Sequence, residues 1–209
     1  MRHIFPDTTD FLFNPMNLPL AFNIAFIPED ATVERCQQIS QELVNQGSSN
    51  YLLGRDGAPH ITLLQGIVES PQSFEGLSDA VERARDRPPY PTLHSEGYYQ
   101  MGEKASLWWK VERSSELQAW HDRVFALAHP FIGNSKAQAE MFGNSGHVRE
   151  QDLQWVEQFG EVAVQDNFLP HITLGYGQAP DIPLEETFQI GYLGLFQLGP
   201  FCSCYNRLV

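Results

Sequence analysis

One five-residue segment, Pro-His-Ile-Thr-Leu, occurs twice in this chain and constrains its fold more than any other feature. The two copies span residues 59–63 and 170–174 and are identical. Their β-branched and apolar residues are typical of a strand. Because side chains alternate along a strand, histidine and threonine lie on one face, and isoleucine and leucine lie on the other. Each copy therefore presents an imidazole beside a hydroxyl, backed by a face that can pack into a core.

The elements that precede the two segments also repeat. In each half of the chain, hydrophobic periodicity indicates a strand, then a helix, then the repeated segment. The second copy follows its opening strand at a greater distance, and the irregular segment 131–160 accounts for the excess. The pattern predicts a duplicated fold in one bilobal domain, 1–209. Its first lobe is expected at roughly 18–101 and its second at roughly 102–209, with an insertion near 131–160.

The same periodicity places the individual elements. Apolar residues alternate with smaller or polar ones from Leu20 to Phe26, which indicates a half-buried strand that ends at Pro28. The remaining elements are expected, in chain order, as a helix at 30–46, a strand at 60–68, a helix at 72–85, strands at 92–101 and 105–112 joined by a turn at 102–104, a helix at 115–128, a helix at 149–159, a strand containing the second segment, and strands at 187–198 and 201–208.

Two imidazoles and two hydroxyls in one cleft suit the cleavage of a phosphodiester. If the two halves pack about a pseudo-two-fold axis, His60 and Thr62 face the same space as His171 and Thr173. An imidazole titrates near neutral pH, so one neutral ring can take a proton from water while the other, protonated, gives one to the leaving oxygen. The hydroxyls then bind the non-bridging phosphate oxygens. This chemistry needs neither a metal nor a cofactor, and the identical motifs leave open which histidine is the acid.

The two H-x-T segments, the strand LWWKV with the helix SSELQAW after it, and the C-terminal strand pair together resemble the 2H phosphoesterases. That family includes 2′,3′-cyclic nucleotide phosphodiesterases and the bacterial 2′-5′ RNA ligase group. The resemblance implies an α+β fold in which two antiparallel sheets face a central groove, with helices on the outside. It also implies metal-independent activity on 2′,3′-cyclic phosphates or 2′-5′ linkages. The family pattern makes His60 and His171 catalytic, and Thr62 and Thr173 phosphate-binding.

Several aromatic and basic residues are candidates for binding the rest of a nucleotide. An aromatic ring can stack on a nucleobase, and the candidates are Trp108, Trp109, Tyr98, Tyr99, Phe168 and Tyr176. Trp108 and Trp109 are neighbours on a strand, so one is expected in the core and the other facing the groove. The candidates for steering a phosphate are Arg55, Lys104 and Lys110.

Charge narrows the class of ligand. The chain has 13 basic and 26 acidic residues, a net charge of −13. Because proteins bind long nucleic acids largely through basic residues on the phosphates, duplex DNA is not expected as a partner. A small nucleotide, or an RNA end that bears a cyclic phosphate, fits better. Oligomeric state is left open by the sequence.

Cysteine content and hydropathy indicate a cytoplasmic protein. Cys36, Cys202 and Cys204 are the only cysteines, an odd and sparse set that suits a reducing compartment. Cys202 and Cys204 are expected on one face of the last strand, as buried thiols. No stretch approaches the ~20 apolar residues of a membrane-spanning helix, so no membrane partner is expected.

Three functions stay open at this point. The first is hydrolysis of a cyclic phosphodiester on a nucleotide or RNA end by paired histidine acid–base catalysis. The second is a 2′-5′ RNA ligase or 2′-5′ phosphodiesterase that uses the same four residues. The third is a catalytically silent module of the same fold that binds a nucleotide or RNA.

Overall fold

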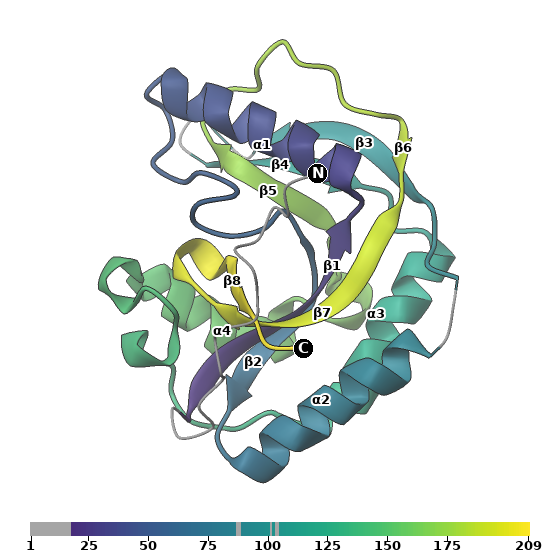
Figure 1. Cartoon of the computed structure of the whole chain (residues 1–209), viewed down its shortest axis with the longest axis vertical. Coiled ribbons are helices and arrows are strands. Elements are labelled where there is room, and N and C mark those ends of the chain that lie inside the picture. The colour runs from purple at the N-terminus through teal and green to yellow at the C-terminus, as the bar shows by residue number, and fades with distance from the viewer. Residues whose placement is uncertain (1–17, 87–88, 101, 103–104) are drawn as a thin grey trace.

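Two four-stranded antiparallel sheets with helices around them form the molecule (Figure 1). The computed structural model describes residues 18–86, 89–100, 102 and 105–209. The strands are β1 (Leu20–Pro28), β2 (Ile61–Val68), β3 (Leu93–Gln100), β4 (Ser106–Val111), β5 (His171–Tyr176), β6 (Thr187–Phe188), β7 (Ile190–Leu198) and β8 (Cys204–Arg207). The α-helices are α1 (Asp30–Asn45), α2 (Pro71–Arg85), α3 (Ser115–Ala128) and α4 (Glu150–Val162). The expected α+β fold is confirmed.

Strand β1 lies inside the first sheet, whose order is β2-β1-β7-β8. On one face Phe26 packs edge-on against Trp120 of α3, with ring centroids 5.4 Å apart. On the other face Ala25 joins a buried cluster with Phe196 and Cys204. Every residue of β1 is buried. The expectation of a half-buried strand was therefore wrong, because both faces of this sheet are covered at β1.

The second sheet has the order β5-β4-β3-β6. Trp109 on β4 is fully buried, and its indole N–H donates to the Ser95 hydroxyl at 2.8 Å. Helix α1 packs against β5 of this sheet, while α2 and α3 lie side by side against the first sheet (Figure 1). These three helices leave β2 and β5 in contact with each other.

The two sheets do not divide the chain at residue 101, as the duplicated pattern had suggested. Strand β3 joins β4 in the second sheet, and β7 and β8 complete the first. Strand β1 is the reason, because its second hydrogen-bonded neighbour is β7, from near the C-terminus, and not β3. Each sheet therefore contains strands from both halves of the sequence. Helix α1, from the first half, also packs against β5, from the second.

The two motif strands have the same irregularity. Each is an edge strand paired antiparallel to its opening strand, β2 with β1 and β5 with β4. The register shifts by one residue at Leu63 in the first pair and at Leu174 in the second. Such a β-bulge inserts one extra residue and changes which later side chains share a face. Gln65 therefore lies on the same strand face as His60 and Thr62, and Tyr176 lies on the same face as His171 and Thr173.

Segment 131–160 contains the expected loop and helix, and it packs onto the first sheet. Besides most of α4, it includes the short 3-10 helices η2 (Ala139–Met141) and η3 (Ser145–His147). Met141 and Val156 form a buried cluster with Ala21 of β1. Ala21 lies on the same face of β1 as Asn23, so the segment covers part of the inner face of this sheet.

The C-terminal strands are shorter than expected. A 3-10 helix, η5 (Pro200–Cys202), stands before β8, and the left-handed backbone of Phe201 (φ 63°) and Cys202 (φ 53°) breaks the strand there. Only Cys204 belongs to β8, so it does not share a strand face with Cys202 as predicted. The three cysteines form no disulfide. The expected turn at 102–104 falls mostly outside the described residues.

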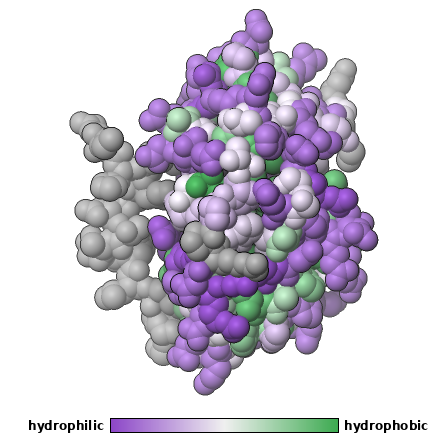
Figure 2. All heavy atoms as spheres, turned by 90° about the vertical axis from the view of Figure 1, so that its right-hand side faces the viewer, coloured by the Kyte–Doolittle hydropathy of each residue, from purple (hydrophilic) through white to green (hydrophobic). Residues whose placement is uncertain are grey.

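No helix in the described part of the chain is both long and apolar enough to cross a membrane. The face in Figure 2 is mainly hydrophilic where its residues are described, with small separate hydrophobic spots. No broad apolar patch is visible on that face.

Candidate active site

The two motif histidines have matching backbone contacts. The Nδ1 atom of His60 lies 2.8 Å from the carbonyl oxygen of Ala58, and Nδ1 of His171 lies 2.8 Å from that of Leu169. Both carbonyls belong to the residue before the motif proline, which proline restricts to an extended backbone. The proline of each motif thus helps to place the acceptor that holds the ring.

This contact selects the tautomer of each histidine. A carbonyl oxygen can only accept, so Nδ1 carries the proton in the neutral ring and Nε2 keeps its lone pair. Both rings are partly exposed, yet burial is the main cause that lowers each pKa. The pKa of His60 falls below its ordinary value, and that of His171 falls to about 4. In the free protein both rings are neutral near pH 7.

The histidines also lie within electrostatic reach of each other. The charge of His60 is among the causes that lower the pKa of His171. The edge strands that carry them, β2 and β5, are in contact. We call the space faced by His60, Thr62, His171 and Thr173 the motif site. A positive charge on His60 opposes protonation of His171.

Two amide side chains orient the hydroxyl of Thr62. Asn23 on β1 donates from Nδ2 to Thr62 Oγ1 at 3.2 Å and to Cys204 Sγ at 3.4 Å. Gln65 donates from Nε2 to the same Thr62 oxygen at 3.5 Å. A hydroxyl has two acceptor lone pairs and one donor. Because N–H groups occupy the lone pairs, the Thr62 O–H is left to donate to a ligand.

The surroundings of the two histidines differ at one position. Opposite Thr62 on the neighbouring strand lies Ala25, whereas Trp108 lies opposite Thr173. The Trp108 indole stacks on His171, with ring centroids 3.9 Å apart and an interplanar angle of 20°. This contact buries one face of His171. The short side chain of Ala25 cannot cover His60 in the same way.

The aromatic candidates separate into core and site residues. As predicted, Trp108 and Trp109 point to opposite sides, and Trp109 is the core residue. Phe168 is buried too and stacks on the His121 ring at 4.2 Å. Trp109 and Phe168 are therefore excluded as base-stacking residues. Tyr98 donates its hydroxyl to the Ile182 carbonyl at 2.7 Å, which leaves Tyr99, Trp108 and Tyr176 as candidates.

The basic candidates are paired with acids or lie elsewhere. Lys110 is the cross-strand neighbour of His171, and it forms an ion pair with Glu96 at 2.6 Å. Arg55 pairs with Asp56 at 2.6 Å and lines a surface pocket that none of the four motif residues lines. Lys104 is outside the described residues. The described part of the chain contains no cluster of three or more His, Cys, Asp or Glu side chains that can hold a metal ion.

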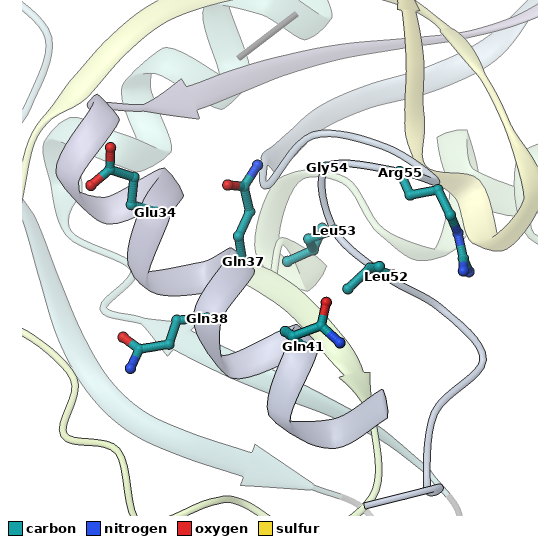
Figure 3. Close-up of a pocket in the computed structure, with 8 residues that line it drawn as sticks. All are labelled: Glu34, Gln37, Gln38, Gln41, Leu52, Leu53, Gly54 and Arg55. Atoms are coloured by element: carbon teal, nitrogen blue, oxygen red, sulfur yellow. The ribbon is translucent and has the colours of Figure 1, made fainter. Parts of the chain in front are cut away.

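A separate surface pocket lies between helix α1 and the loop 52–55 (Figure 3). Gln37 and Gln41 of α1 point toward this loop, which also carries Arg55. None of the four motif residues lines it. Its open, amide-rich walls hold no group that matches the chemistry of the motif site.

Three residues near the motif site were not predicted from the sequence. Asn23 stands out as a polar residue in an otherwise apolar strand, and a buried polar group needs a partner. That signal was available. Gln65 reaches the site only because of the bulge at Leu63. Arg149, which contacts Tyr176 from the inserted segment, has no sequence signal at all.

Known proteins share this fold. A phosphoesterase structure aligns with a TM-score of 0.53 and 16% identity, over 91% of this chain and 96% of that chain. Escherichia coli LigT complexed with NADP+ aligns with a TM-score of 0.50 and 17% identity, over 86% and 87%. LigT in apo form aligns with a TM-score of 0.49 and 16% identity, over 86% of this chain and 87% of that chain. No curated protein matches the chain.

A family model decides the class. The model of the 2′-5′ RNA ligase superfamily matches residues 28–191, which include both motifs. The chain belongs to this superfamily, the group of 2H phosphoesterases that its two motifs resemble.

The stack on Trp108 gives a testable pKa. Replacing Trp108 by Ala uncovers one face of His171, so its pKa should rise from about 4 toward the ordinary value of 6.5. The His171 Hε1 resonance, followed by NMR against pH, measures the change. Trp155→Ala is the control, because Trp155 is 42% exposed on α4. A pKa that stays constant or falls further would show that the indole does not act by burial, since a ring face attracts a cation.

Proposed function

We propose that this protein hydrolyses a cyclic phosphodiester, a 2′,3′-cyclic phosphate or a close relative, on a nucleotide or RNA end. The observation that supports this most is the matched pair of histidines. Each is held through Nδ1 by the carbonyl two residues before it and keeps Nε2 for a ligand. The two are within electrostatic reach of each other.

The proposed reaction is a single displacement by water at phosphorus. One neutral imidazole takes a proton from the water molecule as the water oxygen forms a bond to phosphorus. The bond from phosphorus to one ribose oxygen breaks, and the other imidazole, protonated, gives that oxygen its proton. The product is a phosphomonoester, and one proton is left on the first ring and lost to solvent.

We assign His171 as the base and His60 as the acid. His171 keeps its lone pair down to a pH of about 4, because burial, to which the stacked Trp108 ring contributes, and the nearby His60 lower its pKa. His60 is proposed to be the ring that takes up a proton. Bound phosphate, being negative, raises both pKa values and supplies the charge that holds a proton on His60 at neutral pH. The acid is thereby formed when the substrate binds.

The threonines are proposed to bind the non-bridging oxygens. Thr62 is oriented for this by Asn23 and Gln65, which fill its lone pairs. Thr173 is its counterpart on β5. Two fixed hydroxyls hold the phosphorus in line for attack and stabilise charge that grows on the oxygens.

The nucleoside is proposed to lie along the second sheet. Tyr99 is 40% exposed beside Trp108, with ring centroids 5.7 Å apart, so an aromatic surface extends outward from His171. LigT, which shares the fold, binds NADP+ in its solved complex. A nucleotide ligand fits both the exposed aromatic surface and the LigT complex. A cytoplasmic location is proposed because three free thiols are stable there.

The first test is turnover without metal. The protein is incubated with 2′,3′-cyclic nucleotides in EDTA, and product is measured by chromatography. We expect turnover that survives chelation, and a loss of about 10²–10⁴-fold in kcat for His60→Ala and for His171→Ala. The pH profile of kcat/KM should be bell-shaped, since one ring must be neutral and the other charged. His94→Ala, outside the motif site, is the control.

Other outcomes select the alternatives. Cleavage of 2′-5′-linked dinucleotides without turnover of cyclic nucleotides would favour the 2′-5′ phosphodiesterase or ligase. Nucleotide binding with no turnover of either substrate would favour the silent module. Activity retained in both histidine variants contradicts all catalytic readings of the motif site.

The second test separates acid from base by the leaving group. A p-nitrophenolate departs without a proton, so the acid becomes dispensable on a nucleoside p-nitrophenyl phosphodiester. On this substrate His60→Ala should lose less than about 10-fold, while His171→Ala should still lose about 10²–10⁴-fold. Release of p-nitrophenolate is followed by absorbance. Equal losses for the two variants, or the reverse order, would overturn the assignment.

A further inference from the structure

Tyr176 occupies the position in the second motif that Gln65 occupies in the first. Each lies two residues beyond the bulged leucine of its strand. On the second sheet, Tyr176 pairs with Ser106, whose hydroxyl accepts the Trp108 indole N–H at 2.7 Å. Trp108 in turn stacks on His171. The phenol therefore lies on the face of the motif site.

The hydroxyl of Tyr176 is held from the inserted segment. Arg149, at the start of α4, donates from Nη1 to the Tyr176 oxygen at 2.9 Å. The guanidinium also lies over the Phe201 ring, 4.1 Å from its centroid. Because the oxygen of Tyr176 accepts from Arg149, its own O–H is directed away from the arginine. The described residues provide no acceptor for it.

The remaining donors of Arg149 are occupied. Its Nε and Nη2 reach the carboxylate of Asp152, the latter at 2.5 Å. With the Gln151 amide turned so that its oxygen faces the guanidinium, that oxygen accepts from Nη1 at 2.9 Å and from Nη2 at 3.2 Å. All five N–H groups of the fork are then engaged. Arg149 thus has no donor left for a ligand and acts through Tyr176.

Asp152 makes this arrangement rigid. Its carboxylate is buried, with 2% of the side chain exposed, and it accepts from the backbone N–H of Arg149 at 3.0 Å and of Phe201 at 3.1 Å. The second contact joins α4 to η5, where the left-handed backbone of Phe201 needs support. A buried charge with these partners leaves Arg149 little freedom to move.

We propose that Tyr176 is a third hydroxyl donor to the phosphate in the motif site, and that Arg149 and Asp152 of the inserted segment are its positioning residues. This inference rests on the proposed function. The ring of Tyr176 is flanked by Phe201, with centroids 5.7 Å apart, and by Arg149 at 5.9 Å. Its hydroxyl, and not its ring face, is the group presented to a ligand. The inserted segment is in consequence part of the binding site.

A double-mutant cycle on phosphate binding tests the proposal. The variants are Tyr176→Phe, which removes only the hydroxyl, Arg149→Lys, which keeps the charge beside Asp152, and both together. The dissociation constant of inorganic phosphate is measured by calorimetry, with kcat and KM for a 2′,3′-cyclic nucleotide. Tyr176→Phe should weaken phosphate binding about 10- to 100-fold, the range for a hydrogen bond to a charged group. Tyr205→Phe, on β8, is the matched control.

The cycle distinguishes positioning from support of the fold. If Arg149 acts through Tyr176, Arg149→Lys weakens binding in the wild-type background and adds little to Tyr176→Phe. Thermal midpoints near that of the wild type show that the variants fold. Wild-type phosphate affinity in Tyr176→Phe, or fully additive losses in the double variant, would overturn the inference. So would absence of phosphate binding by the unaltered protein.

The inference and the proposed function can fail separately. Phosphate binding that follows the cycle, without turnover of cyclic nucleotides, supports the inference and contradicts the function. Turnover that needs both motif histidines but is unchanged in Tyr176→Phe, in KM as well as kcat, supports the function and contradicts the inference.

Discussion

In each of the two motifs, a hydrogen bond from the histidine Nδ1 to the carbonyl two residues earlier determines what the motif site can do. It selects the tautomer in which Nε2 is the free base, and it fixes the ring before any ligand arrives. The motif proline restrains the residue that supplies the carbonyl. Without this contact the rings of His60 and His171 can turn, and neither nitrogen has a defined partner. The rest of the proposed chemistry depends on it.

The interleaved sheets bring these two fixed rings together. Strand β7 from near the C-terminus completes the sheet of β1, and α1 packs against β5, so the two halves of the chain are interleaved. The motif strands stay at the edges that meet. The symmetry is then broken by neighbours: Trp108 covers His171 where Ala25 leaves His60 open, and Tyr176 stands where the first motif has Gln65. These differences are the basis for proposing a base, an acid and an additional donor in two otherwise equal motifs.

The repeated segment sufficed to predict both motif strands, and the order of strands and helices indicated the α+β class. The catalytic and phosphate-binding roles of the four motif residues stay a prediction, which rests on the alternation of side chains along a strand. The repeated segment did not predict the division of the sheets, since the choice of β7 over β3 as partner of β1 depends on packing across the whole chain. The two β-bulges were not predicted either, because one extra residue, Leu63 or Leu174, does not change the hydrophobic periodicity of the strand. Nor could spacing reveal Arg149, whose contact with Tyr176 is purely tertiary.

A crystal structure with a nucleoside 2′-phosphate bound tests the central claim most directly. The account predicts the phosphorus between the two rings, with each Nε2 about 2.6–3.2 Å from a phosphate oxygen and the Thr62 and Thr173 hydroxyls on the others. A phosphate held by only one motif, or bound in the pocket beside α1 (Figure 3), would contradict it.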